Sequence, residues 1–396
     1  MEKIGFYAGS FDPFTRGHLA VICKALCRFD VVIVGIGRNP DKQGLFSPEE
    51  RKKLIRLALD DFKYSYRNRV LNGMSFSLTE EGALYRLEHH EDCLKIIVYS
   101  DLTVDAALRF GATALIRGER SVGDRESEMK LSATNRELLA VRHRHLDTDM
   151  IPVPKIELAN VSSSAVKGLF AAGEYVAAMK YVTPSVHQAL SERYLKKRYT
   201  SLFDKEWDKL QQAYSYRRVY HTLSHVAYCL NYVDIFCNTS DPEKIKSVLE
   251  MRDCLSKALF WHDFCVEQTN AEELSAAAAV KAVASPEEHK YVRELIMATR
   301  HDGKQHDYNE ACRVMHDVDL AILGDTENYG IYAMQVCKEY APCCPAAIYV
   351  RDRIDVLQHF ISSKPRLYQT DFFAEMFEES AEKNLRRELN YWLCLR

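Results

Sequence analysis

The sequence has no uninterrupted apolar run that approaches the length of a membrane-spanning helix. Its first residues show no secretory pattern, because Lys3 and Asp12 flank only a short apolar segment. A net charge of −3 excludes bulk attraction to nucleic acid or to an anionic membrane. The 12 cysteines are scattered and form no paired zinc-binding pattern, so we expect reduced thiols and a cytoplasmic protein.

The chain does contain enough material for more than one domain. It has 396 residues, and 47% of them are hydrophobic, which is ample for separate cores. A basic segment, residues 196–198, follows a helical pattern and is a plausible linker. We therefore expect one domain over residues 1–198 and a second over residues 199–396.

Residues 9–18, Gly-Ser-Phe-Asp-Pro-Phe-Thr-Arg-Gly-His, form the most informative stretch of the chain. They follow an apolar run at 4–8 and precede an apolar-periodic run at 19–29, an order that predicts strand, turn and helix. A helix N-terminus offers unpaired backbone N–H groups and a positive dipole end, so it can hold a phosphate. Gly9 allows close approach of a ligand, and His18 lies at the mouth of the helix.

Short apolar runs alternate with helical patterns through the rest of this half. We expect strands at 4–8, 31–36, 96–99, 112–116 and 150–153, and helices at 19–29, 48–62, 103–110, 126–141 and 162–172. Ser47, Pro48 and Glu50 have the pattern of a capping box at the start of the second helix. Residues 117–124 are expected to be a loop, and residues 63–94 follow no clear pattern. The alternation predicts an α/β fold with a doubly wound parallel sheet, in which ligands bind at the carboxyl ends of the strands.

Several motifs of this half resemble bacterial phosphopantetheine adenylyltransferase. The resemblance covers roughly residues 1–195. Its most specific part is Arg117-Gly118-x-Arg120-x-Val122-x-Asp124 with Glu128, and the other motifs are Gly9 to Pro13, Thr15 to His18, Asn39-Pro40 with Lys42, Leu45-Phe46, Glu49 to Arg51, Asn135-Arg136 and Ser162 to Ser164.

This resemblance implies transfer of the adenylyl group of ATP to 4′-phosphopantetheine, giving dephospho-coenzyme A and pyrophosphate. His18 would steady the transition state at the α-phosphate, and Mg²⁺ would bridge the triphosphate. The resemblance implies that the pantetheine phosphate is held by Ser10, Lys42 and Arg117. It also implies that ATP is held by Arg120, Glu128 and the Ser162, Ser163 and Ser164 helix start, and that Gly9, Phe11, Leu102, Thr103 and Gly118 line the substrates.

The sequence departs from the family pattern at several positions. Glu119 stands where the family has an apolar residue, and Arg125 and Ser127 replace aromatic residues. About thirty extra residues are present at 63–94. These departures keep open a different phosphorylated acceptor, such as nicotinamide mononucleotide. We expect a homo-oligomer, although the insertion argues against the usual hexamer.

The second half shows only long helical periodicities, so we expect it to be all-α. Its histidines and aspartates recur in a pattern that suits a divalent transition metal. The segments are Tyr220-His221 with His225, His262-Asp263, His301-Asp302, and His316-Asp317 with Asp319.

This order resembles the HD superfamily of metal-dependent phosphohydrolases. The resemblance implies that His225, His262, Asp263 and Asp319 bind a metal such as Mn²⁺, Fe²⁺, Ni²⁺ or Zn²⁺, with Asp317 as the alternative to Asp319. The Tyr-His-x-x-x-His segment is similar to that of cyclic-nucleotide phosphodiesterases, which implies that His221 is a general acid. A metal-activated hydroxide would then attack phosphorus. Further candidates are His301, Glu272 and Glu273.

Two interpretations of the second half remain open from the sequence. It is either a phosphohydrolase of unknown substrate, making the chain bifunctional, or a metal- or nucleotide-binding regulatory module without catalysis. In both cases the expected partners of the first half are ATP, 4′-phosphopantetheine and dephospho-coenzyme A, with no nucleic acid and no membrane.

Overall fold

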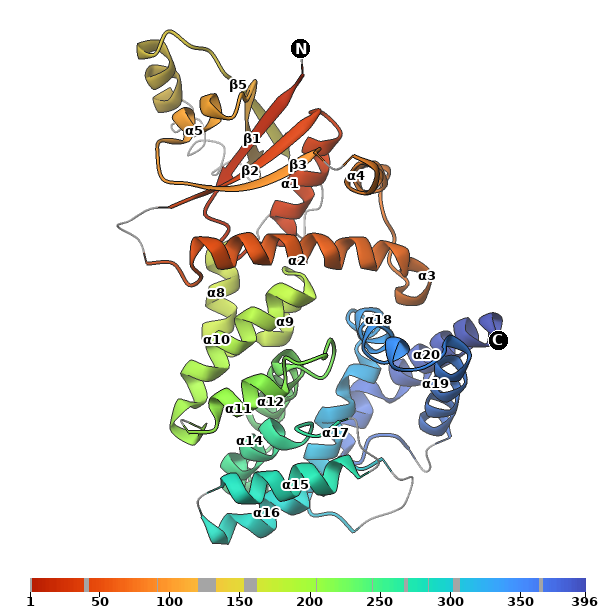
Figure 1. Cartoon of the computed structure of the whole chain (residues 1–396). Coiled ribbons are helices and arrows are strands. Elements are labelled where there is room, and N and C mark those ends of the chain that lie inside the picture. Colours follow the sequence, from red (N-terminus) through yellow and green to blue (C-terminus); the bar gives the residue numbers. More distant parts are fainter. Residues whose placement is uncertain are drawn as a thin grey trace. The chain divides into compact units, whose positions relative to one another are not determined.

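The protein is described by a computed structural model. It covers residues 2–38, 43–90, 92–119, 133–152, 162–203, 205–243, 245–266, 270–283, 285–301, 307–362 and 366–396. Contacts divide the chain into two units (Figure 1). Unit 1 contains residues 1–67, 75–172 and 177–187, and unit 2 contains residues 68–74, 173–176 and 188–396.

Unit 1 is built on a five-stranded parallel sheet of order β3-β2-β1-β4-β5. Its strands are β1 (Ile4–Gly9), β2 (Val31–Gly37), β3 (Leu94–Tyr99), β4 (Ala114–Glu119) and β5 (Asp147–Pro152). The β-branched run of β2 is buried along almost its whole length, as a central parallel strand requires. The predicted parallel α/β sheet is therefore confirmed. The expected loop at 117–124 begins too early, because β4 pairs with β5 as far as Glu119.

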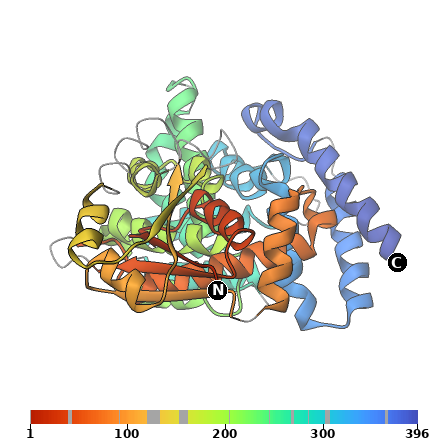
Figure 2. The same ribbon diagram turned by 90° about the horizontal axis from the view of Figure 1, so that it is seen from above.

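Helices cover both faces of this sheet. α1 (Arg16–Leu26) and α4 (Leu78–His89) lie side by side, as Figure 1 and the view from above in Figure 2 both show. α5 (Thr103–Arg109) packs on another face, where a core joins Val104 and Ala107 to Phe6 and Ile33. α2 (Pro48–Arg67) begins with the predicted capping box. Its Ser47 N–H donates to Glu50 at 2.7 Å, and the Glu50 N–H donates to the Ser47 hydroxyl at 3.3 Å.

Every secondary-structure element that the structure describes in unit 2 is a helix, which confirms the all-α prediction for the second half. Its main helices are α11 (Trp207–Ala213), α12 (Leu223–Thr239), α13 (Lys246–Glu250), α14 (Arg252–Trp261), α15 (Ala271–Ala282), α16 (Pro286–Met297), α17 (Glu310–Gly324), α18 (Tyr329–Tyr340), α19 (Ala346–Ile361) and α20 (Asp371–Leu395). The helices α8 (Ser163–Ala172), α9 (Tyr175–Met179) and α10 (Pro184–Phe203) connect the two halves of the sequence. Among the described residues, no helix combines the length and hydropathy that a membrane crossing requires.

The unassigned region at 63–94 contains α4 and a short helix, α3 (Arg69–Asn72), whose contacts lie in unit 2. The Asn72 side-chain amide donates to the sulfur of Met334 at 3.5 Å. A Cβ atom added to Gly330 of α18 would lie only 2.0 Å from the Asn72 carbonyl oxygen. Glycine at 330 is therefore what allows α3 to pack directly on α18. This long-range contact explains why the local pattern was uninformative.

We expect Gly330→Ala to lower the free energy of unfolding of unit 2 by about 1–3 kcal/mol, because backbone must move to admit the methyl group. Tryptophan fluorescence during urea unfolding is the measurement, since Trp207, Trp261 and Trp392 all lie in unit 2. Gly168→Ala is the control, because its Cβ would meet nothing within 4 Å in unit 1. An unchanged transition for Gly330→Ala would contradict the packing described above.

Candidate functional site

The turn between β1 and α1 holds His18 in one orientation. Thr15 caps α1, and its hydroxyl accepts the His18 N–H at 3.4 Å. In return, Nδ1 of His18 accepts the Thr15 N–H at 3.0 Å. Because Nδ1 is the acceptor, the neutral imidazole carries its proton on Nε2, which is then a donor. The ring packs against Phe11 and Phe14, with centroids 5.1 and 5.6 Å away, so its direction is fixed.

Asp12 fastens this turn to the segment that precedes α2. Its carboxylate accepts the backbone N–H of Leu45 at 2.8 Å and of Phe46 at 3.0 Å. Arg51, which is only 8% exposed, donates to the Phe46 carbonyl at 2.7 Å and to the Ser10 carbonyl at 3.2 Å. The Ser10 main chain is thus held by a guanidinium that sequence reasoning left without a role.

The start of α8 lies against the same turn. The Ser163 hydroxyl donates to the Pro13 carbonyl at 2.8 Å, and the Ser162 hydroxyl accepts the Ala165 N–H at 3.0 Å. Lys167 reaches Asp12 from this helix, with its Nζ 3.5 Å from the carboxylate. The structure therefore brings the serine triplet and the Gly9–His18 turn together, 150 residues apart in the sequence. Two helix N-termini and an ammonium group meet there, which favours a phosphate-bearing ligand.

The remaining predicted residues of unit 1 lie at the carboxyl ends of β3 and β4 or outside the described residues. Arg117 and Gly118 are in β4, and Leu102 is half exposed just before α5. The Thr103 hydroxyl bonds the Tyr99 hydroxyl at 2.9 Å. Burial raises the pKa of Tyr99, and the positive charge of Arg117 partly opposes this rise. The Arg117 charge is therefore felt at the carboxyl end of β3, where Tyr99 lies. Lys42, Arg120 and Glu128 lie outside the described residues.

In unit 2 the side chains of His225, His262, Asp263 and Asp319 converge. Their potential ligand atoms all lie within 4.8 Å of one another. The two Nε2 atoms of the histidines are 3.2 Å apart, and Asp319 Oδ1 lies 3.1 Å from His225 and 3.4 Å from His262. Asp263 Oδ2 lies 3.0 Å from His262 Nε2. Two imidazoles and two carboxylates directed at one point form a donor set that suits a divalent transition metal.

Outer partners fix the direction of both histidines. Nδ1 of His262 donates to the Leu259 carbonyl at 2.8 Å, so the Nε2 lone pair of the neutral ring faces the cluster. Nδ1 of His225 lies 3.0 Å from the Tyr220 hydroxyl. Burial lowers the pKa of His262, but Asp263 and Asp319 outweigh it and raise the pKa well above its ordinary value. The cluster therefore requires positive charge, which a proton or a bound cation can supply.

His221 lies beside the cluster and is held by Glu339. Its Nδ1 is 2.6 Å from the Glu339 carboxylate, which also accepts the backbone N–H groups of Val219 at 2.6 Å and Tyr220 at 2.7 Å. Burial lowers the pKa of His221, but the charges of Asp263 and Glu339 outweigh it and raise the pKa. Burial raises the pKa of Glu339, and its hydrogen bond to His221 more than reverses this, to about 2. Sequence reasoning missed Glu339, which is 118 residues from His221.

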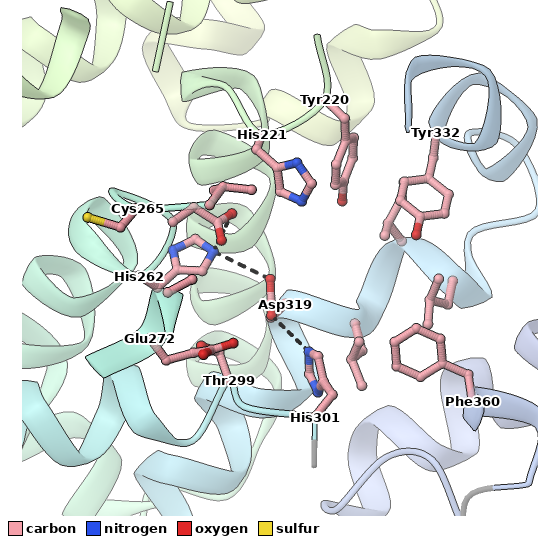
Figure 3. A pocket seen from close by; sticks show the side chains of 16 residues that line it. Tyr220, His221, His262, Cys265, Glu272, Thr299, His301, Asp319, Tyr332 and Phe360 are labelled. Carbon is pink, nitrogen blue, oxygen red and sulfur yellow. Dashed lines mark hydrogen bonds and ion pairs between the residues drawn. The ribbon is translucent and has the colours of Figure 1, made fainter. Parts of the chain in front are cut away.

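His221, His262, Asp263 and Asp319 line a cavity of about 230 Å³ (Figure 3). The view shows His262 on one side of Asp319, Tyr332 and Phe360 on the other, and His221 above it. The lining also includes Tyr220, Cys265, Val266, Ala271, Glu272, Thr299, His301, Leu320, Ile322 and Leu323. His301 Nε2 lies 3.2 Å from Asp319 Oδ2, so the two carboxylate oxygens of Asp319 face different neighbours.

Two other candidates of unit 2, Asp317 and Glu273, have structural partners. Asp317 is fully buried and accepts the N–H groups of Gln369 and Thr370, both at 2.7 Å, at the start of α20. Glu273 pairs with Arg300 at 2.7 Å. The structure thus places Asp319, and not Asp317, in the cluster.

Comparison with known proteins defines the class of unit 1. Residues 6–169 match the family model described as cytidylyltransferase-like. The phosphopantetheine adenylyltransferase of Porphyromonas gingivalis is 38% identical over 175 residues, which are 44% of this chain and 92% of that protein. The enzyme of that name from Lachnoclostridium phytofermentans is 32% identical over 196 residues, covering 50% of this chain and 98% of its own. The chain therefore belongs, through its N-terminal half, to the phosphopantetheine adenylyltransferase family.

A solved structure of Plasmodium falciparum nicotinic acid mononucleotide adenylyltransferase complexed with NaAD is also similar to part of this chain. It aligns with 50% of this chain and 97% of its own, at 17% identity and a TM-score of 0.31.

Proposed function

We propose that unit 1 transfers the adenylyl group of ATP to 4′-phosphopantetheine. The observation that carries this proposal is the meeting of His18, the start of α1 and the serine start of α8 at one turn of a family member. An oxygen of the acceptor phosphate attacks the α-phosphorus of ATP, the bond to the β-phosphate oxygen breaks, and pyrophosphate leaves. The step needs no proton transfer, so positioning and charge neutralisation are the work of the protein.

Each part of the turn has a role in this proposal. The Nε2–H of His18 donates to the oxygens of the transferred phosphoryl group, where negative charge is redistributed in the transition state. Backbone N–H groups at the starts of α1 and α8 bind phosphates, and Arg117 with Lys42 neutralises the acceptor phosphate. Magnesium bound with ATP supplies further charge neutralisation. Arg120 and Glu128 are proposed to contact ATP.

The acceptor is tested by a panel of phosphorylated compounds with ATP, scored for pyrophosphate. We expect 4′-phosphopantetheine to give the highest kcat/KM. Faster pyrophosphate release with nicotinamide mononucleotide would instead support that compound as the acceptor, the alternative that Glu119 suggests. The expected homo-oligomer stays a prediction. Analytical ultracentrifugation of the same sample tests it.

For unit 2 we propose a metal-dependent phosphohydrolase, with His225, His262, Asp263 and Asp319 as metal ligands. The convergence of these four side chains and the outer hydrogen bonds of the two histidines support this proposal. A divalent metal bound there would supply a Lewis acid and lower the pKa of water. His221 gives its proton to the leaving ester oxygen as the phosphorus–oxygen bond breaks, and water supplies the new oxygen on phosphorus.

The pairing of His221 with Glu339 supports hydrolysis over a regulatory role without catalysis. A regulatory module would need the metal ligands but no acid held at the edge of the cavity. A panel of phosphate esters assayed with Mn²⁺, Mg²⁺ and Ni²⁺ tests this directly. Metal binding without any hydrolysis would support the regulatory interpretation.

The acid role of His221 predicts a pH effect. A general acid works only when protonated, so activity falls as pH rises through its pKa, and the Glu339 charge moves that fall to higher pH. Glu339→Gln should shift the alkaline limb of the kcat profile about one pH unit downward. Glu327→Gln, a change of equal charge away from the cavity, should leave the limb in place. An unshifted limb in Glu339→Gln would contradict the role of this pair.

A further inference from the structure

The cavity of unit 2 contains a third carboxylate that the proposed metal site does not use. Glu272 lies in the first turn of α15 and lines the cavity, on the side where Figure 3 also places His301. A carboxylate near a helix N-terminus is stabilised by the helix dipole. The next residue, Glu273, is paired with Arg300 at 2.7 Å. Within the described ranges, no hydrogen bond or ion pair reaches the carboxylate of Glu272.

No lysine or arginine side chain belongs to the described lining of this cavity. Two arginines that neighbour lining residues, Arg300 and Arg218, donate to other groups of the protein. Arg300 pairs with Glu273, and Arg218 donates to the backbone carbonyls of His221 and Phe264 at 3.3 and 3.0 Å. Three carboxylates, those of Asp263, Glu272 and Asp319, therefore line the cavity, and a divalent metal bound at the proposed site would balance two of their charges. Such a cavity accommodates one negative charge on a ligand far better than two or more.

We propose that Glu272 is a specificity-determining residue that restricts this site to singly charged phosphate esters. This inference rests on the proposed phosphohydrolase function of unit 2. A phosphodiester carries one negative charge, whereas a phosphomonoester carries two above its second pKa, and a nucleoside triphosphate carries more. The carboxylate of Glu272 repels the second negative charge of such a ligand across the cavity.

The opposite wall of the cavity suits the second organic group of a diester. Leu320 and Leu323, which follow Asp319 on α17, line the cavity together with Tyr332 of α18 and Phe360 of α19. Figure 3 shows Tyr332 and Phe360 together on the side of Asp319 away from His262. A monoester would leave part of this apolar wall in contact with water, whereas a diester with an apolar or aromatic substituent covers it.

Binding of two non-hydrolysable probes isolates the charge effect. Phenylphosphonate and its monomethyl ester share a phenyl ring and a phosphorus–carbon bond, but at about pH 8.5 they carry two charges and one. We expect the manganese-loaded protein to bind the ester about tenfold more tightly in calorimetry. Glu272→Gln should reduce that preference to about twofold or less, mainly by strengthening phenylphosphonate binding. Glu287→Gln, an exposed change of equal charge on α16, should keep the wild-type preference.

Hydrolysis gives a second readout. Bis(p-nitrophenyl) phosphate and p-nitrophenyl phosphate release the same p-nitrophenolate, so the acid role of His221 affects both little. Water supplies the oxygen that replaces p-nitrophenolate on phosphorus in each case. The kcat/KM ratio of diester to monoester should fall about tenfold in Glu272→Gln, and intrinsic reactivity cancels when this ratio is compared with wild type.

The outcomes separate the two proposals. If the metal-loaded wild type hydrolyses neither ester, the phosphohydrolase function fails, while the binding preference still tests charge selection. If hydrolysis occurs but both ratios are the same in wild type and Glu272→Gln, charge selection by Glu272 is wrong and the hydrolase function stands. A loss of bound manganese in Glu272→Gln would also overturn the proposal, because it would make Glu272 a metal ligand.

Discussion

Replacing His18 by alanine should lower the rate of ATP-dependent pyrophosphate release about 100- to 1,000-fold. The loss follows because the Nε2–H donor acts on the charge that is redistributed in the transition state, where a single donor contributes this much. Binding of ATP should weaken much less, since backbone N–H groups of two helix starts still hold its phosphates. The measurement is coupled pyrophosphate release, with KM for ATP determined separately from kcat.

Two control variants separate loss of catalysis from loss of folding. His18 is 8% exposed and belongs to the cap of α1, so His18→Ala could weaken the fold. His18→Asn places a side-chain oxygen near Nδ1 and should preserve the cap without restoring the rate. His145→Ala removes a histidine whose side chain is 86% exposed and should leave the rate unchanged. Equal activity of wild type and His18→Ala would contradict the proposed mechanism, as would loss of manganese binding in His18→Ala.

Replacing Asp319 by alanine should weaken metal binding more than about 100-fold, because even an outer partner of a ligand contributes 10- to 100-fold. Elemental analysis of wild type purified without chelators should find at least one divalent ion per chain. The variant should hold none and should take up little manganese on titration. A metal-free wild type that also fails to bind added manganese would refute the proposed site.

Asp317 provides the matched control, since it lies on the same helix two residues away. It accepts three hydrogen bonds at the start of α20, two from backbone N–H groups and one from the Thr370 hydroxyl. Asp317→Ala should therefore lower the free energy of unfolding by about 3 kcal/mol or more, since each charged hydrogen bond contributes about 1.5–3. Its manganese affinity should stay within about threefold of wild type. The reverse pattern in the two variants would exchange the roles assigned to Asp317 and Asp319.

The parts of the fold that local sequence determines were predictable. The β-branched run of β2 and the Ser47 capping box depend on neighbours within a few residues, and both have the expected form. The predicted ends of the strands were less accurate. β4 continues to Glu119 because its pairing with β5, and not its own composition, decides where it stops.

Features that depend on distant parts of the chain could not be predicted. Asn72 belongs to a stretch without periodicity, and only packing on Gly330 explains its place. Glu339 looks like any helical glutamate in the sequence, yet it binds His221 across 118 residues. Lys167 likewise reaches Asp12 across 155 residues. By contrast, the resemblance to a metal-dependent phosphohydrolase superfamily selected His225, His262, Asp263 and Asp319 together, and the structure brings their potential ligand atoms within 4.8 Å of one another. Their metal-binding role stays a prediction.

The two units contain chemically different centres. The turn of unit 1 combines backbone N–H groups with cationic side chains, which suits polyanions such as ATP. The cavity of unit 2 combines carboxylates with imidazoles and has an apolar wall, which suits a metal and a weakly charged ester. One chain would therefore carry two sites of opposite charge preference.

The most direct test of the account is a crystal structure of the protein with dephospho-coenzyme A. We expect the adenylate phosphate of the ligand beside Nε2 of His18, with its oxygens at the starts of α1 and α8 near Ser163. A well-ordered nucleotide bound anywhere else, with this turn empty of phosphate, would contradict the central claim.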